Sequence, residues 1–313
     1  MMKTCNAAAM AIAMSVIAAT AQAAAPAEVT VQGAAMFPES LTSTRGGDLI
    51  IGGSSTGAVY RAKKGAGTAS VWIDPAKTGI KSVLGVFAHD ASNTLYVCSV
   101  SPRGVTPPLD DQSNLHTFNL TTGAHLKTYP LPDGAKSVCN DIALDKAGNA
   151  YVAETSGGRI LRLKKGGAKL EEWSKDERLK GADGLGFIAD GQLIVNTVTT
   201  GRLFRIPSSK DGVAGAVVEL EPSLKLAGPD GIRAIGGNKL LQAESRAARI
   251  TEITVNGDKA EIRVVKGETP SATSMTLVGN TVWYNNAKFN YLSDPALKGQ
   301  DPGAFVIHSA PLK

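Results

Sequence analysis

The chain has 313 residues, a length that suggests two domains, although all-β folds of this size often form one domain around one closed core. Its formal charge of +5 and its isoelectric point near 9.0 raise the question of nucleic-acid binding. The lysines are scattered in short turn-like pairs such as Lys63-Lys64 and Lys164-Lys165, and no patch interleaves basic with aromatic side chains, which argues against that class.

The first 23 residues have the pattern of a secretory signal peptide. Lys3 is followed by an apolar, alanine-rich run that ends at Ala21-Gln22-Ala23, so we expect cleavage after Ala23 and a mature domain over residues 24–313. A membrane anchor is the alternative, but the run is short and ends in alanine rather than at a charged stop, and no later segment is expected to span a membrane. The sequence therefore predicts a periplasmic or secreted protein.

Two cysteines remain after this cleavage, because Cys5 departs with the leader. Cys98 and Cys139 can pair in an oxidising compartment, but two cysteines do not make a disulfide scaffold. Their separation along the chain says nothing about their distance in space, so the sequence leaves the pairing open.

Six segments of the mature chain can be laid over one another. Each predicts a strand, a turn rich in Gly, Asn or Asp, and a second strand, and most continue into a third. In chain order they are FPESLTSTRGGDLIIGGSSTGAVYR from Phe37, SVLGVFAHDASNTLYVCSV from Ser82, VCNDIALDKAGNAYVAETSGGRILRL from Val138, GADGLGFIADGQLIVNTVTTGRLFRI from Gly181, GPDGIRAIGGNKLLQAESRAARITEI from Gly228 and SATSMTLVGNTVWYNN from Ser271.

One position near the start of the first strand aligns in all six segments. The residues found there are Glu39, Leu84, Asn140, Asp183, Asp230 and Thr273, and successive ones are 43 to 56 residues apart. A period of this size with three or four short strands per unit is typical of a propeller blade. The sequence thus predicts an all-β, six-bladed β-propeller in a single domain.

The segment EVTVQGAAMF, which precedes the first repeat, has no repeat partner of its own. We expect it to pair into the last blade beside the C-terminal segment AFVIH. Such pairing would close the ring and protect the edges of its strands.

The ends of the strands indicate which face of the propeller carries the chemistry. In an antiparallel blade the start of the first strand and the end of the second lie at the same end of the sheet. The two long insertions, from Ser99 to Asn114 and from Asn285 to Gly303, fall at that end, and loops on a rigid scaffold often build a binding site. Glu154 and Glu244 also follow second strands there, which makes them candidates for substrate binding.

Four of the six aligned residues carry side-chain oxygens, namely Glu39, Asn140, Asp183 and Asp230. Three carboxylates that converge on one axis repel one another unless a cation or bound protons compensate them. Oxygen donors suit a hard cation, Ca²⁺ first and then Mg²⁺ or Mn²⁺. Asp and Asn before Gly are also ordinary turn residues, so an Asp-Gly pair alone says little about function, whereas Glu39 follows Pro38 and has no such explanation.

Zinc is less favoured than these ions, because the sequence holds no His-rich or Cys-rich cluster. The four histidines fall at turns or on outer strands and are interpreted as surface or packing residues. They are His89, His116, His125 and His308.

At these residues the chain resembles the superfamily that includes senescence marker protein, gluconolactonase and luciferin-regenerating enzyme. The motifs that carry the resemblance are FPES, CNDIALDKAGNAYVAET, GADGLGFIADG and GPDGI. The resemblance implies that Glu39, Asp183 and Asp230 hold a divalent metal, Ca²⁺ or else Mg²⁺, Mn²⁺ or Zn²⁺. It also implies that Asn140 helps to hold substrate or metal-bound water.

Two positions depart from the pattern of that superfamily. Its members usually have Asn where this chain has Asp183, and the added negative charge should tighten divalent-cation binding or raise a carboxyl pKa. Its sugar lactonases tend to have Arg two residues before the Asn of Asn-Asp, whereas this chain has Val138 there. This argues against a sugar-acid lactone as the substrate.

Two functions are consistent with these residues. The first is metal-assisted hydrolysis of a lactone or related ester, with Asp230 as metal ligand and general base and Asn140 orienting a small-molecule substrate or water. The second is a non-catalytic periplasmic propeller that binds a ligand or a protein around a structural metal. A closed, water-accessible cavity beneath the two insertions, with a metal position left open, would favour hydrolysis, and a shallow or fully ligated site would favour binding or a structural role.

Overall fold

The computed structural model of the chain describes residues 1–2, 27–103, 106, 108–109 and 111–312. Apart from Met1 and Met2, the predicted signal peptide and its cleavage site lie outside these residues. In the described ranges, no helix has the length and apolar character needed to cross a membrane.

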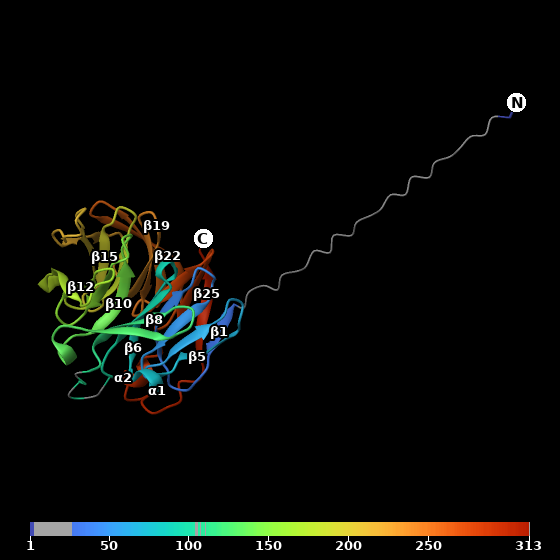
Figure 1. Cartoon of the computed structure of the whole chain (residues 1–313), viewed down its shortest axis with the longest axis horizontal. Helices are drawn as coiled ribbons and strands as arrows, with labels where there is room; N and C mark the ends of the chain where they lie inside the picture. The colour runs from blue at the N-terminus through green and yellow to red at the C-terminus, as the bar shows by residue number, and fades with distance from the viewer. Residues whose placement is uncertain (3–26, 104–105, 107, 110, 313) are drawn as a thin grey trace.

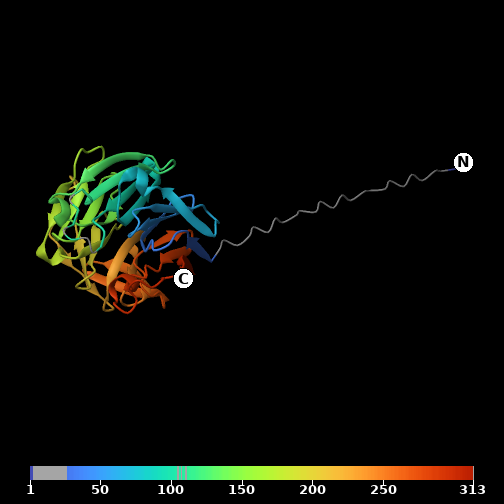
Figure 2. The same ribbon diagram turned by 90° about the horizontal axis from the view of Figure 1, so that it is seen from below.

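Short strands make up about half of the described chain, and they form sheets arranged around a common centre (Figure 1). Figure 2 shows the sheets following one another around this centre in chain order, so that the red C-terminal strands lie beside the blue N-terminal ones. The fold is therefore all-β and propeller-like, in agreement with the predicted class.

Three of the sheets have four strands each, paired antiparallel in chain order. They contain β6 (Val83–His89), β7 (Thr94–Ser99), β8 (Asn114–Asn119) and β9 (His125–Pro130); β10 (Cys139–Leu144), β11 (Ala150–Glu154), β12 (Arg159–Leu163) and β13 (Glu171–Lys175); and β14 (Ala182–Phe187), β15 (Leu193–Thr197), β16 (Arg202–Ile206) and β17 (Val218–Glu219). A fourth sheet has five strands. It contains β19 (Pro229–Gly236), β20 (Lys239–Glu244), β21 (Arg249–Asn256), β22 (Lys259–Gly267) and the short parallel strand β18 (Glu221–Pro222).

An eight-stranded sheet joins the two ends of the chain. In spatial order it contains β2 (Pro38–Ser43), β3 (Leu49–Gly53), β4 (Val59–Ala62), β5 (Thr68–Ile73), β1 (Glu28–Val31), β25 (Phe305–Pro311), β24 (Thr281–Asn285) and β23 (Met275–Val278). β1 lies antiparallel to β25, with Val29 opposite Ile307, and parallel to β5, with Val31 opposite Ala69. The predicted pairing of the N-terminal strand with the C-terminal strand is confirmed.

Helices in the described ranges are single turns within connections. α1 (Pro75–Thr78) lies between β5 and β6, and α2 (Asn290–Ser293) lies between β24 and β25. The 3-10 turns are Asp90–Ser92, Gly134–Lys136 and Glu177–Leu179.

Neighbouring sheets pack their apolar faces against each other. Between the β2–β5 strands and the β6–β9 sheet, Ile50 packs in one cluster with Val86 and Phe118, and all three side chains are fully buried. The next interface contains a disulfide between Cys98 of β7 and Cys139 of β10, whose Cα atoms lie 5.2 Å apart. The cysteine pairing that the sequence left open therefore links two neighbouring sheets.

The innermost strands approach one another very closely at the centre. A Cβ atom added to Gly184 of β14 would lie 2.3 Å from the carbonyl oxygen of Asp230, and one added to Gly85 of β6 would lie 2.1 Å from that of Asn140. Neither glycine has a positive φ, and Asp183-Gly184 lies inside β14. The interpretation of this pair as an ordinary turn is therefore wrong, because glycine is required here by the close approach of two backbones.

Candidate functional site

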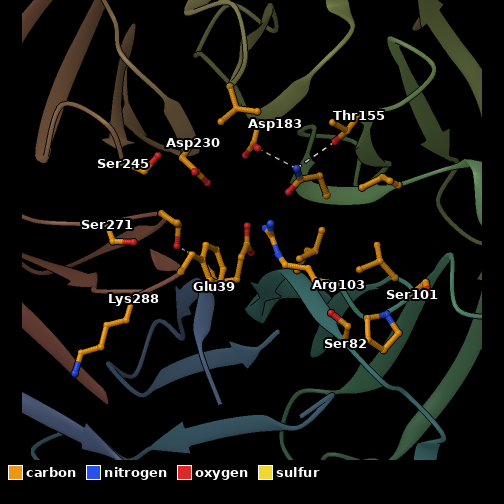
Figure 3. A pocket seen from close by; sticks show the side chains of 18 of the residues that line it. Glu39, Ser82, Ser101, Arg103, Thr155, Asp183, Asp230, Ser245, Ser271 and Lys288 are labelled. Atoms are coloured by element: carbon orange, nitrogen blue, oxygen red, sulfur yellow. Dashed lines mark hydrogen bonds between the residues drawn. The ribbon is translucent and has the colours of Figure 1, made fainter. Parts of the chain in front are cut away.

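The starts of the innermost strands form the floor of a cavity of about 1010 Å³. Glu39 of β2, Asn140 of β10, Asp183 of β14 and Asp230 of β19 all line it, and each is only 5% to 7% exposed. Figure 3 shows the three carboxylates directed toward the same space. Residues that share one position in the sequence repeat thus meet at one site; we call the three carboxylates Glu39, Asp183 and Asp230 the floor carboxylates.

The Asn140 amide connects a floor carboxylate to the wall of the cavity. Its Nδ2 donates to Asp183 Oδ2 at 3.0 Å and to Thr155 Oγ1 at 3.1 Å (Figure 3). Asp183 lies in β14 and Thr155 directly follows β11, so the two bonds fix the orientation of the amide beside the carboxylates.

Two fully buried asparagines hold the backbone beneath the floor. Asn196 Nδ2 donates to the carbonyl oxygen of Asp230 at 2.6 Å, and Asn285 Nδ2 donates to the carbonyl oxygen of Glu39 at 3.1 Å. Each asparagine stands near the end of the second strand of its sheet or repeat, where sequence analysis assigned it no role. Their positions in the aligned segments could have indicated a repeated structural amide.

Burial and mutual repulsion both disfavour the ionised forms of the floor carboxylates. Burial raises the pKa of Glu39 well above its usual range, and the charges of Asp183 and Asp141 raise it further. Burial and the charge of Asp141 also raise the pKa of Asp183 to about 7, and burial together with Asp183 raises the pKa of Asp230 well above its ordinary value. A cation bound among these groups would favour their ionised forms.

A buried ion pair closes the centre behind the floor. Arg233 donates through Nη1 to both carboxylate oxygens of Asp141, at 2.9 and 2.7 Å. Its Nη2 donates to the carbonyl oxygens of Leu41 at 3.2 Å and of Val86 at 3.1 Å. This arginine therefore ties β19 to β2, β6 and β10. It forms its ion pair with Asp141, and its charge also lowers the pKa of Glu39 against the stronger effect of burial.

The donor chemistry of the floor suits a hard divalent cation. Carboxylate and amide oxygens are the ligands that Ca²⁺ and Mg²⁺ prefer, and within the described ranges no ion pair involves a floor carboxylate. As the side chains stand, no group of three or more His, Cys, Asp or Glu residues in the described part of the chain is arranged to hold an ion. The residues therefore fit a cation in the kind of donor atoms they offer, and their present arrangement is not that of an ion-binding cluster.

Glu154 and Glu244 do not reach the cavity, contrary to their predicted role in substrate binding. Both side chains are fully buried. Glu154 Oε2 accepts from Arg159 Nε at 3.0 Å, and Glu244 Oε2 accepts from Arg249 Nη2 at 2.7 Å. In each pair the two residues lie directly opposite each other across a hairpin. A carboxylate at this position therefore neutralises the arginine of the next strand and does not face a ligand.

Each of these glutamates also fixes the segment that leads into an innermost strand. Glu154 Oε1 accepts from the backbone N–H of Val138 at 3.0 Å, and Glu244 Oε2 accepts from that of Ala227 at 3.0 Å. Their role is therefore to hold the backbone just before Asn140 and Asp230.

The two insertions line the mouth of the cavity, as the sequence predicted. The segment after β7 contributes Val100 and Arg103, and the segment after β24 contributes Phe289 and Tyr291. Val138 adds an apolar wall, and no histidine lines the described part of the cavity. Sequence analysis did not single out Arg103, although it is the one basic residue of the first insertion.

Comparison with known proteins finds similarity in structure but not in sequence. No protein-family model and no curated protein matches the chain. Mala s 1, the major allergen of Malassezia sympodialis, is 16% identical, with a TM-score of 0.66 over 91% of this chain and 96% of that one. The chain shares its fold.

Two further solved structures have the same architecture. A gluconolactonase from Xanthomonas campestris is 15% identical, with a TM-score of 0.62 over 90% of this chain and 89% of that one. Luciferin-regenerating enzyme is 13% identical, with a TM-score of 0.60 over 90% of this chain and 93% of that one. The resemblance inferred from the sequence motifs is thus confirmed at the level of the fold, and the fold by itself does not fix a reaction.

Proposed function

We propose that the protein is a metal-dependent hydrolase of a lactone or related ester. The observation that carries this proposal is the set of floor carboxylates, three buried acidic groups that form no ion pair in the described ranges and line a cavity of about 1010 Å³. Such a site disfavours its own negative charge, and sites of this kind are typical of catalysis or cation binding.

The residues of the floor would bind the cation and accept a proton in this reaction. Glu39, Asp183 and Asp230 would hold the cation, Ca²⁺ being the best match to oxygen donors. When bound, the cation would polarise the carbonyl of the substrate and compensate the charge of the carboxylates. Asp230 would accept a proton from water while the water oxygen adds to the acyl carbon. The acyl carbon–oxygen bond then breaks, and the proton passes to the leaving oxygen, giving a hydroxy acid.

Asn140 would orient the substrate or the attacking water in this scheme. Its Nδ2 is already bonded to Asp183 and Thr155, so the amide has a fixed orientation before any ligand arrives. Preset hydrogen-bonding groups contribute to catalysis because they need no rearrangement at the moment of reaction.

The cavity onto which the floor carboxylates open supports hydrolysis over the alternative of a non-catalytic binding propeller with a structural metal. A structural metal is usually closed off by its ligands, whereas here the floor carboxylates open onto a cavity large enough for a small molecule. The gluconolactonase and the luciferin-regenerating enzyme among the structural neighbours support a hydrolytic function in the same way.

We also propose that the propeller has six blades and functions outside the cytoplasm. The eight-stranded sheet would count as two blades, the first and the last, joined where β1 lies between β5 and β25. The disulfide Cys98–Cys139 supports export, because such bonds persist in oxidising compartments such as the periplasm or the extracellular space.

An activity assay with controlled metal content tests the hydrolase proposal. The mature protein is stripped with a chelator and assayed on aliphatic and sugar lactones, alone and with Ca²⁺, Mg²⁺, Mn²⁺ or Zn²⁺. We expect turnover that depends on the added ion and that falls roughly 10²- to 10⁴-fold in Asp230→Ala. Asp211→Asn, which changes an exposed aspartate, serves as the matched control and should retain full activity. Turnover that is absent throughout, or equal in wild type and Asp230→Ala, would reject the proposal.

A further inference from the structure

A single cationic side chain from the first insertion reaches over the cavity and is held there by an aromatic ring of the second. The Cζ atom of Arg103 lies 4.5 Å from the centroid of the Phe289 ring. Phe289 is itself packed against the apolar cluster that contains Phe37 and Phe305. This stacked arrangement restrains the guanidinium without using its N–H groups.

Figure 3 shows the Arg103 side chain extending toward the space that the floor carboxylates face, with its guanidinium near Glu39. The charge of Arg103 lowers the pKa of both Glu39 and Asp183, against the stronger effect of burial. The two insertions thus place one positive group at the edge of the proposed reaction centre.

The other two cations of the cavity wall each donate part of their N–H groups to backbone carbonyls. Lys288 Nζ donates to the carbonyl oxygens of Pro302 at 2.6 Å and of Ala304 at 2.8 Å. Arg246 Nη2 donates to the carbonyl oxygen of Val198. Within the described ranges the Arg103 guanidinium donates no hydrogen bond.

The charge balance of the cavity favours an anionic ligand once a cation is bound. Three carboxylates and three cationic side chains line its described part, so their formal charges cancel. A divalent cation on the floor would leave a net charge of about +2 facing the substrate. A monoanionic substrate reduces that excess, and one guanidinium can bind both oxygens of one carboxylate.

We infer that Arg103 binds a carboxylate group of the substrate and that Phe289 positions the Arg103 guanidinium. This inference rests on the hydrolase function proposed above. The substrate class is then a lactone or ester that also carries a free carboxylate, with its apolar part against Leu84 and Val138 of the cavity wall.

Matched anionic and neutral probes test this inference through binding as well as turnover. One pair is γ-butyrolactone-γ-carboxylate and its primary amide; the other is mono-nitrophenyl glutarate and its methyl ester. Binding is measured by calorimetry on Ca²⁺-loaded Asp230→Asn, with and without Arg103→Ala, and kcat and KM are measured on otherwise wild-type protein.

We expect Arg103→Ala to weaken binding of the anionic probes about 10- to 100-fold and that of the neutral probes less than about 2-fold, as for loss of a charge-assisted hydrogen bond. Arg103→Lys should recover only part of the loss, because lysine lacks the planar fork. Phe289→Leu should raise KM for the anionic probes with little change in kcat. Arg246→Gln is the matched control for a general field effect and should leave the preference for the anion intact.

The outcomes separate this inference from the hydrolase proposal. If neutral and anionic probes are hydrolysed equally well, the hydrolase proposal stands and the carboxylate site is rejected. If no probe is hydrolysed but the anions bind in an Arg103-dependent way, the carboxylate site stands and hydrolysis is rejected. Equal binding of anionic and neutral probes, or an equal loss in Arg246→Gln, overturns the inference.

Discussion

Glu154 and Glu244 are buried as deeply as the floor carboxylates, yet their surroundings are opposite. Each of the two glutamates faces an arginine across a hairpin and accepts backbone N–H groups, so its charge is balanced within the fold. The floor carboxylates have no ion-pair partner in the described ranges and raise one another's pKa values. A buried carboxylate therefore indicates a functional site only when the fold leaves its charge without a partner.

Among the substitutions that test this difference, Glu244→Ala should have the largest effect on the free energy of unfolding. The change removes the partner of Arg249 and leaves the N–H of Ala227 without its acceptor, so we expect a loss of about 3–5 kcal/mol in the free energy of unfolding. Urea denaturation followed by tryptophan fluorescence at pH 7 measures it. Glu261→Ala, which removes an exposed glutamate of β22, should cost less than about 0.5 kcal/mol. A loss below about 1 kcal/mol for Glu244→Ala would contradict the structural role.

Protonation of a buried histidine should have an intermediate effect on stability, because its imidazole is held neutral in the folded protein, whereas Glu154 and Glu244 are ion-paired. His116 of β8 hydrogen-bonds Ser99 and Thr128, and burial lowers its pKa from 6.5 to about 4, with a small contribution from His125. Between these two pH values the unfolded chain binds a proton that the folded protein does not. Stability is therefore complete above about pH 6.5 and is lost as the pH falls toward 4, by up to about 3 kcal/mol.

Urea denaturation from pH 4 to pH 8 measures this dependence. In His116→Gln the contribution of the imidazole disappears, and the slope of stability against pH between 4 and 6.5 should become shallower. NMR titration of the His116 ring gives the pKa directly. Equal slopes in the two proteins, or a ring pKa near 6.5, would show that His116 does not remain neutral in the folded state.

The smallest expected effect on the free energy of unfolding is a gain rather than a loss. Asp183→Asn removes one of the floor carboxylates, and relief of repulsion should stabilise the metal-free protein by about 1–2 kcal/mol at pH 8. In Ca²⁺ the wild type should gain stability and the variant should gain less. Thermal unfolding with chelator or with Ca²⁺ measures both changes, and Asp211→Asn on the exposed surface should follow the wild type. Destabilisation of metal-free Asp183→Asn would place this residue with Glu154 and Glu244 as a structural carboxylate.

The repeat in the sequence was sufficient to predict how the floor is assembled. Sheets that succeed one another around a centre bring equal repeat positions to the same level, so Asp183 and Asp230 could be placed together from their spacing alone. The same alignment predicted where the insertions would lie. It also predicted the pairing of β1 with β25, because the N-terminal segment had no other strand to join.

The remaining features depend on side-chain orientations and on the course of loops, which a sequence repeat does not encode. Glu154 was placed at the correct end of its strand, but its carboxylate turns to Arg159, five residues later across a tight turn. That spacing recurs in Glu244 and Arg249 and could have been read as a cross-strand ion pair. The position of Arg103 depends on the course of an insertion, and the disulfide depends on which faces of two sheets meet, so neither follows from periodicity.

The position of β1 between β5 and β25 constrains the timing of folding. Glu28 and His308 are 280 residues apart in sequence, yet they lie opposite each other in adjacent strands. During synthesis β25 is made long after β1, so β1 cannot acquire this neighbour until the sheets between them in sequence have been made. Such distant pairing makes folding slow and leaves the first strand exposed in the meantime. A chain shortened before Phe305 would lack this contact and expose the edges of both β1 and β24 to association with other chains.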